Sequence, residues 1–380
     1  MPKRREADYP PRVTPALDLF ATCTPGLEAI LAGELTALGL TPKILDGGVA
    51  FAGNLSDMMR ANLWLRTAGR VLVRVAEFHA SSFDELERHA RRVAWSEWLA
   101  PTSVTVSVSA SQSRLYHTGA IAERLLAAIA RPAAAKSTDH ERHAGQLVLA
   151  RFVRDRCTLS IDTSGELLHR RGYRLDVAKA PLRETLAAAI LLAAGYDGAR
   201  PLVDPLCGSG TIPIEAALIA RRIAPGRRRD FAFRGSPYFD DREWKNVLDK
   251  ADEMVSPTAS APIFASDRDA GAVRATTGNA QRAGVGGDLG VELRAFAAGG
   301  APLPGGLFIT NPPYGVRIGE RRSVSDLYAR LVGAARARVP GGRLAVLCSD
   351  GKWAEQKALR EVVTTKNGGL SVRLLMGDVL

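Results

Sequence analysis

Asn311, Pro312, Pro313 and Tyr314 are the residues of this chain whose types and order point most directly to chemistry. They follow an apolar run at 306–310, which predicts a buried strand, so they stand at a strand end. The prolines fix the backbone and lack N–H donors, which leaves carbonyl groups projecting. The Asn311 side-chain oxygen and the Pro312 carbonyl can accept hydrogen bonds from an exocyclic amino group, while Tyr314 can stack on the base that carries it. A proline-rich turn explains the prolines but not the flanking asparagine and tyrosine.

A second candidate site is a glycine-containing loop between a predicted strand at 201–203 and a predicted helix at 212–223. Glycines let backbone approach a ligand where a Cβ would clash, and the next helix offers free N–H groups. The loop has neither the Gly-Lys-Ser/Thr of a phosphate-binding loop nor the third glycine of the dinucleotide fingerprint. Taken alone, it fits either a nucleotide-binding loop or a tight turn. Its candidate ligand-binding residues are Asp204, Pro205, Cys207, Gly208, Ser209, Gly210 and Thr211.

Asp267, at the end of the next predicted strand, is the third candidate. A carboxylate there can accept hydrogen bonds from both ribose hydroxyls of a nucleoside cofactor. The neighbouring Asp269 fits a helix N-cap, so a purely structural role is the alternative for this acidic pair.

These three segments share one pattern, because each follows a short apolar run and the runs alternate with helices. Such runs, at 201–203, 262–265, 306–310 and 344–348, predict a parallel sheet covered on both faces. Asn367-Gly368-Gly369 predicts a hairpin between 362–365 and 370–375, so the sheet should end in an antiparallel pair. Before this region, residues 17–165 read as two small α+β units behind a proline-rich arm.

Composition narrows the class of protein. The chain has 380 residues, a net charge of +11 and no apolar run of the roughly 20 residues that span a membrane. Its four cysteines lie far apart, which argues against disulfides and metal clusters, and the six histidines are dispersed. We expect a cytoplasmic protein without a metal, taken as a monomer. The positive excess lies in both halves of the chain, which suggests a nucleic acid partner, although basic proteins without such a partner are common.

Several segments together resemble bacterial THUMP-domain S-adenosylmethionine-dependent RNA guanine-N2 methyltransferases, in particular the N-terminal half of the ribosomal RNA enzyme RlmL. The resemblance covers nearly the whole chain. It rests on Asp204-Pro-Leu-Cys-Gly-Ser-Gly-Thr, Asn311-Pro-Pro-Tyr, Asn62-Leu-Trp-Leu-Arg-Thr-Ala, Leu168-His-Arg-Arg-Gly-Tyr-Arg, Ala180-Pro-Leu-Arg-Glu-Thr-Leu-Ala-Ala and Asn367-Gly.

The resemblance implies an α/β fold: a Rossmann-like class I methyltransferase domain with a mixed seven-stranded sheet, preceded by α+β ferredoxin-like and THUMP domains. The expected divisions are an arm and ferredoxin-like domain at 1–65, a THUMP domain at 66–165, a linker at 166–182 and the methyltransferase domain at 183–380.

The resemblance also implies roles for single residues. Asp204, Gly208 and Gly210, with the rest of their loop, would surround the methionine part of S-adenosylmethionine. Asp267, with Arg268 beside it, would hold the ribose. Thr185 and Asn311 would touch the cofactor, and Asn311 to Tyr314 would hold the target base. Relatives usually place an acidic residue near the position of Ala297 to receive the adenine amino group, and this chain has none there.

Two arginine groups are candidates for RNA phosphate contacts, although charge runs are often only solvated surface. They are Arg170, Arg171 and Arg174 in the linker, and Arg227, Arg228 and Arg229 in the catalytic region.

The expected reaction is methylation of a guanine N2 amino group in 23S rRNA. The alternatives are the same chemistry on tRNA, adenine-N6 methylation, and a non-catalytic RNA-binding assembly factor. The adenine alternative arises because both targets are planar aromatic amines. The intact Asn311–Tyr314 segment argues against the assembly factor, whereas the absent carboxylate near Ala297 mildly favours it.

Overall fold

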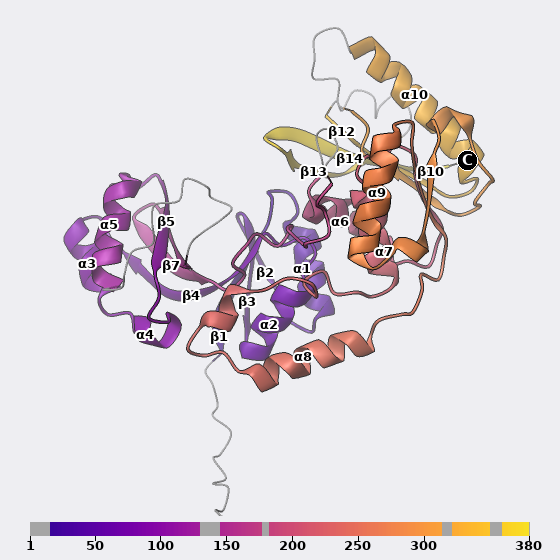
Figure 1. The fold of residues 1–380 in the computed structure, drawn as a ribbon. Helices are drawn as coiled ribbons and strands as arrows, with labels where there is room; N and C mark the ends of the chain where they lie inside the picture. Colours follow the sequence, from indigo (N-terminus) through magenta and orange to yellow (C-terminus); the bar gives the residue numbers. More distant parts are fainter. Residues whose placement is uncertain (1–15, 130–144, 177–181, 314–320, 350–358, 380) are drawn as a thin grey trace, which may run out of the picture.

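The computed structural model describes residues 16–129, 145–176, 182–313, 321–349 and 359–379. Tyr314 of the predicted base-binding segment lies outside these residues. Two seven-stranded sheets organise the chain, one in each half (Figure 1). No helix of the described part is long and apolar enough to cross a membrane.

The N-terminal sheet has the strand order β2-β3-β1-β4-β7-β6-β5. Its strands are β1 (Leu17–Thr22), β2 (Lys43–Leu45), β3 (Gly48–Gly53), β4 (Arg70–His79), β5 (Val104–Ser111), β6 (Gln146–Val153) and β7 (Arg156–Asp162). The helices of this half are α1 (Glu28–Ala37), α2 (Leu55–Trp64), α3 (Phe83–Ala90), α4 (Trp95–Trp98) and α5 (Thr118–Ile129). Because β4 pairs with β1 on one side and β7 on the other, the sheet runs unbroken across the domain division expected at residue 65.

The C-terminal sheet has the order β10-β9-β8-β11-β12-β14-β13. Its strands are β8 (Leu202–Asp204), β9 (Ile263–Asp267), β10 (Leu289–Leu293), β11 (Leu307–Thr310), β12 (Arg343–Cys348), β13 (Arg360–Asn367) and β14 (Leu370–Asp378). The first five strands of that order are parallel, and β14 and β13 close the sheet as the antiparallel hairpin predicted from Asn367-Gly368-Gly369. The expected mixed seven-stranded sheet is thereby confirmed.

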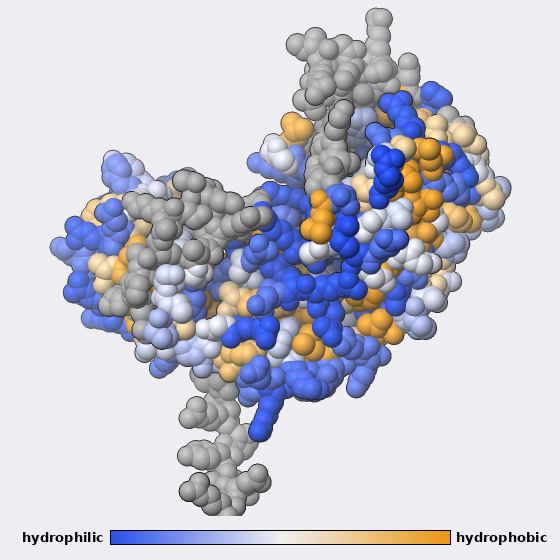
Figure 2. Space-filling model, viewed as in Figure 1, coloured by the Kyte–Doolittle hydropathy of each residue, from blue (hydrophilic) through white to orange (hydrophobic). Residues whose placement is uncertain are grey.

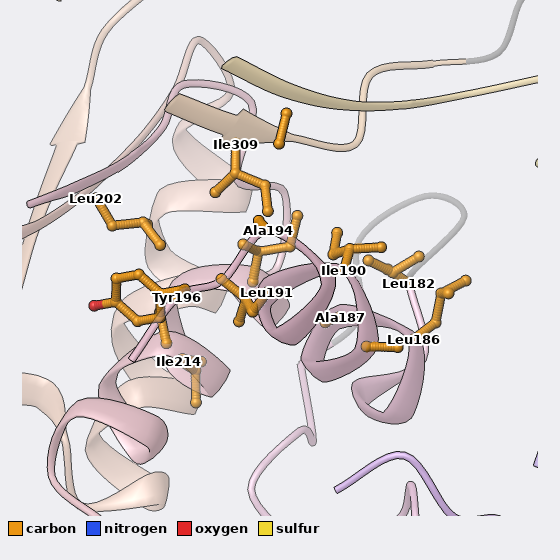
Figure 3. Close-up of a cluster of buried hydrophobic side chains, with 14 of the residues drawn as sticks. Leu182, Leu186, Ala187, Ile190, Leu191, Ala194, Tyr196, Leu202, Ile214 and Ile309 are labelled. Atoms are coloured by element: carbon orange, nitrogen blue, oxygen red, sulfur yellow. The ribbon is translucent and has the colours of Figure 1, made fainter. Parts of the chain in front are cut away.

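Helices cover both faces of this sheet. The covering helices are α6 (Glu184–Ala193), α7 (Thr211–Ala220), α9 (Ala270–Ala283) and α10 (Arg321–Arg338), whereas α8 (Asp241–Glu253) of the same half packs elsewhere. On one face, α6, α7 and α9 bury a core in which Ile190, Tyr196 and Ile214 meet Leu202 and Ile309 of the strands (Figure 3). On the other face, α10 contributes Leu331 and Ala335 to a second core. Continuous apolar strands such as β11 are buried because both faces are covered.

The two halves are packed together rather than strung on a free linker. Helix α8 belongs to the C-terminal half, yet its Trp244 and Val247 pack in the same core as Met58 and Leu63 of α2 (Figure 1). The segment at 166–182, expected to be a linker, carries the buried residues Arg171 and Tyr173 between the halves. The N-terminal sheet is therefore held firmly against the C-terminal half.

Candidate active site

The candidate site lies at the carboxyl ends of β8 and β11, where the strand order reverses. From β8 the chain proceeds outward through β9 and β10, then returns to place β11 on the other side of β8. Loops at such a switch point diverge and leave a crevice, which is where open α/β sheets bind ligands. The glycine loop follows β8, and Asn311 follows β11, so the fold brings the two predicted segments together.

Asp204 joins these two segments. The Thr310 hydroxyl donates a hydrogen bond of 2.9 Å to Asp204 Oδ1, and the Leu206 N–H donates to the same oxygen at 3.2 Å. Asp204 is only 1% exposed, and burial raises the pKa of its carboxyl group to about 7, with the Asp267 carboxylate adding to the rise. No cation of the described residues is among the groups that shift this pKa. A buried carboxylate without a cation is suited to the ammonium group of a ligand.

Asp267 lies on the other side of the glycine loop. Its carboxylate accepts a hydrogen bond from the Gly208 N–H at 3.1 Å and one from the Asp269 N–H at 3.0 Å. Asp269 in turn caps α9 through its side chain, as expected from the sequence. Asp267 is half-buried and the adjoining Arg268 is exposed, so both border the solvent-facing side of the loop.

Helix α9 supports the glycine loop from beneath. The Thr276 hydroxyl donates to the Gly208 carbonyl at 3.0 Å, and the Asn279 amide donates to the Ser209 carbonyl at 3.0 Å. Gly210 has φ +82°, and a Cβ there would lie 2.7 Å from the Thr276 side chain, so only glycine fits. Thr276 and Asn279 are fully buried. Sequence reasoning missed both, and missed Thr310, because nothing local links them to the loop.

The remaining predicted cofactor residues surround this arrangement. Pro205, Cys207, Ser209 and Thr211 are buried within the loop and the start of α7, and burial raises the pKa of the Cys207 thiol. Thr185 is buried in the first turn of α6. Its contact with a cofactor stays a prediction. Asn311 is half-buried, Pro312 is buried and Pro313 is exposed at the end of β11.

A crevice lies beside β9 and β10, in the region where the sequence resemblance implies an adenine-binding acid. Its lining includes Pro205, Ser266, Glu292, Arg294 and Phe296. Glu292 supplies a carboxylate two residues before Arg294, and it forms an ion pair with that arginine. The segment after β10 thus has a carboxylate nearby, although it comes from within the strand.

Three of the six arginines predicted to contact phosphate instead bind carboxylate or carbonyl groups within the protein. Arg171 is 2% exposed and pairs with Glu215 of α7 at 3.0 Å. Arg174 binds both carboxylate oxygens of Glu184, at 2.9 and 3.0 Å. Arg229 donates to the carbonyls of Leu167 at 2.8 Å and Ser164 at 3.2 Å, and burial lowers its pKa to about 10. These side chains hold the segment between the halves, so the structure corrects their assignment to RNA.

The other three lie nearer the surface. Arg227 is 43% exposed and forms a two-point ion pair with Asp252 on α8. Arg228 is exposed and donates to the Arg282 carbonyl. Arg170 lies 3.9 Å from the Glu166 carboxylate. A phosphate contact by these three stays a prediction. No group of metal-binding side chains occurs in the described part of the chain.

Models of three protein families match the chain in succession. The RlmL ferredoxin-like domain matches residues 18–72, the THUMP domain matches 80–162, and the RMKL-like methyltransferase domain matches 171–373. The chain belongs to the RMKL-like methyltransferase family. S-adenosylmethionine is the cofactor that this family uses.

Individual relatives agree with the family. Slr0064 of Synechocystis, named as a proposed RNA methyltransferase, is 36% identical over 94% of this chain and 95% of its own length. The ribosomal RNA large subunit methyltransferase K/L of Syntrophotalea carbinolica is 38% identical over 96% of this chain, which spans about half (54%) of that enzyme. The crystal structure of SMU.472, named as a proposed methyltransferase and complexed with SAH, superposes with a TM-score of 0.85 at 30% identity, covering 95% of this chain and 97% of SMU.472.

Proposed function

We propose that this protein transfers a methyl group from S-adenosylmethionine to the exocyclic N2 amino group of a guanine in RNA, with 23S rRNA as the substrate. The observation that carries the proposal is the juxtaposition of Asn311 with Asp204 at the switch point of the sheet. Asp204 is hydrogen-bonded to Thr310, and Thr310 is the residue immediately before Asn311. A ligand ammonium on Asp204 and an amino group on Asn311 would therefore be close neighbours.

The glycine loop supplies the cofactor side of this site. Asp204 would bind the ammonium of the methionine part, and the Gly208–Gly210 backbone would lie against the chain that leads to the sulfonium. Asp267 would accept hydrogen bonds from the ribose hydroxyls. When bound, S-adenosylmethionine supplies an electrophilic methyl group.

The segment after β11 supplies the base side. The Asn311 side-chain oxygen and the Pro312 carbonyl would accept hydrogen bonds from the guanine amino group. The lone pair of that amino group is delocalised into the ring, which makes it a weak nucleophile. Two acceptors orient the N–H bonds and stabilise the positive charge that develops on nitrogen during transfer. No strong base is needed beforehand, because the product ammonium is acidic and loses its proton readily.

RNA is the proposed substrate because of the charge, the THUMP match and the names of the relatives. The net charge of +11 favours a polyanion. Slr0064 is named for RNA methylation, and the K/L enzyme for the large-subunit ribosomal RNA. These names support the RNA class, and the K/L name favours rRNA.

The test uses methyl-labelled S-adenosylmethionine with unmodified 23S rRNA and unmodified tRNA, followed by digestion to nucleosides. We expect label in N2-methylguanosine from 23S rRNA with the wild type. Asn311→Ala should lose about 10²-fold or more in kcat, because it removes an acceptor that acts on the transition state. Label in tRNA alone would move the function to tRNA, and label in adenine would overturn the guanine assignment. Absence of S-adenosylmethionine binding would indicate an assembly factor.

A further inference from the structure

Two turns at one end of the N-terminal sheet form a surface that the methyltransferase site does not use. One is the loop at 112–117, between β5 and α5, and the other is the β6–β7 turn at Arg154-Asp155. We call them the turn pair. They belong to the lobe that carries β5 and α5, whose visible face is largely hydrophilic (Figures 1 and 2).

The backbone of the turn pair is strained. Gln112, Arg154 and Asp155 have φ values of +51°, +51° and +60°, a region that side chains other than glycine rarely occupy. Among the described residues, only one other non-glycine residue, Arg222, has a positive φ. A hairpin turn of this kind normally takes Asn-Gly, so arginine at its first position carries a conformational cost. Strain of this type concentrates at functional sites.

Hydrogen bonds tie the two turns together. Arg154 Nε donates to Gln112 Oε1 at 3.1 Å, and the Arg114 N–H donates to Asp155 Oδ1 at 2.7 Å. The Asp155 N–H donates to Ser113 Oγ at 3.0 Å. The strained turns thus form one connected platform rather than two loose loops.

One side chain of the platform is buried, and the side chains on either side of it are exposed. Leu115 is 7% exposed and lies near the core, while Arg114 before it and Tyr116 after it are exposed. Tyr116 is 66% exposed, and no other phenylalanine, tyrosine or tryptophan of the described residues is classed as exposed. Its ring lies against that of His117, with centroids 4.1 Å apart. An aromatic ring displayed in this way buries little of its own surface.

Positive charge accompanies this aromatic ring. The Arg114 side chain is 78% exposed, with its Nε 3.8 Å from Asp155, and Arg154 is exposed as well. An aromatic face flanked by exposed guanidinium groups is the arrangement that binds single-stranded nucleic acid, since bases stack on the ring and phosphates pair with the cations. A folded protein partner would favour a larger apolar patch than a single tyrosine supplies.

We infer that the turn pair binds an unpaired segment of the RNA substrate, with a base stacked on Tyr116 and the adjoining phosphates held by Arg114 and Arg154. This inference rests on the proposed RNA function, and it names the residues of the THUMP-matched segment, 80–162, that would contact the RNA.

The test measures the Kd of a fluorescein-labelled single-stranded RNA of mixed sequence by fluorescence anisotropy, together with KM and kcat for unmodified 23S rRNA. Tyr116→Ala should raise Kd and KM about tenfold, the loss expected for one stacked base, with kcat unchanged. Tyr116→Phe keeps the ring and should remain near the wild type. Met254→Ala, which truncates a half-exposed apolar side chain beside α8, is the matched control and should change neither constant.

The charge contribution has its own test. Arg114→Gln combined with Arg154→Gln should reduce the slope of log Kd against log salt by about one to two, as for two lost phosphate contacts. Arg242→Gln combined with Lys250→Gln, two exposed residues on α8, controls for the change in net charge.

An RNA Kd for Tyr116→Ala within twofold of the wild type would overturn the inference. If Tyr116→Ala instead lost self-association or binding to a protein partner while its RNA Kd stayed unchanged, the turn pair would be a protein interface and the inference would again be wrong. Failure of this inference can be distinguished from failure of the proposed function. RNA binding is measured without methyl transfer, whereas the proposed function fails if no RNA nucleoside is methylated.

Discussion

The arginines at the junction of the two halves differ in burial and in their partners from the arginines of the turn pair. Arg66, Arg171 and Arg229 are largely buried, and each one binds carboxylate or carbonyl groups of the other half or of the connecting segment. Arg114 and Arg154 are exposed on strained turns. All five carry the same charge. The comparison teaches that partners and burial, rather than charge runs, decide which arginines hold the fold and which can meet RNA.

The junction network explains why its arginines are costly to disturb. Arg66 donates to the Ile223 carbonyl at 2.8 Å, and Arg171 donates to the Arg66 carbonyl at 2.7 Å. Glu215 is fully buried on α7, where it accepts a hydrogen bond from the Tyr173 hydroxyl at 2.9 Å and pairs with Arg171. Because α7 begins at the glycine loop, this network links the N-terminal half to the helix that follows the cofactor site.

The largest effect is expected from Glu215→Ala. It leaves Arg171 buried without its carboxylate, which should lower the free energy of unfolding by about 3–5 kcal/mol. Asp252→Ala removes the partner of Arg227 from an exposed pair and should cost no more than about 1 kcal/mol. Urea unfolding of both variants checks the contrast, and equal losses would show that burial does not distinguish the two sets of arginines.

A second prediction concerns Asp204, a buried carboxyl group whose pKa no cation of the described residues lowers. With a pKa of about 7, its carboxyl group is mostly protonated at pH 5.5. In the proposed site it would have to be ionised to bind the ammonium of S-adenosylmethionine. Cofactor affinity should therefore rise about eightfold between pH 5.5 and 6.5, in step with the ionised fraction. Calorimetric titrations at the two pH values measure this. Asp204→Asn should bind S-adenosylmethionine weakly, with little dependence of the affinity on pH. If this variant kept the pH dependence of the wild type, a group other than Asp204 would be its cause.

The smallest effect is expected at the strained turn. Arg154→Gly relieves a positive φ and should raise the free energy of unfolding by about 1 kcal/mol, while weakening RNA binding. A gain in stability together with a loss of RNA affinity would show that the strained backbone at Arg154 serves RNA binding rather than folding. If Arg154→Gly destabilised the protein, the turn would be structural, like the junction.

Sequence patterns predicted the catalytic half well where local signals were strong. The apolar runs located β8, β9, β11 and β12, and the Asn-Gly-Gly turn located the closing hairpin. The runs did not reveal β10, because Leu289–Leu293 is a partly exposed edge strand with glycine and glutamate among its five residues. Local patterns carry little information about such a strand.

The site was predictable only in part for a similar reason. Asp204 and Asn311 stand in recognisable segments, whereas Thr276, Asn279 and Thr310 support them through contacts between distant parts of the chain. Arg171 looked like a surface cation because Glu215, its partner, lies 44 residues away. The fold must be known before such pairs can be identified.

Nucleoside analysis of 23S rRNA from cells lacking this gene tests the central claim most directly. The account predicts that one N2-methylguanosine is lost, that the wild-type gene restores it, and that the gene with Asn311→Ala does not, although that variant protein accumulates normally. An unchanged N2-methylguanosine content in the deletion strain, or full restoration by the Asn311→Ala variant, would contradict it.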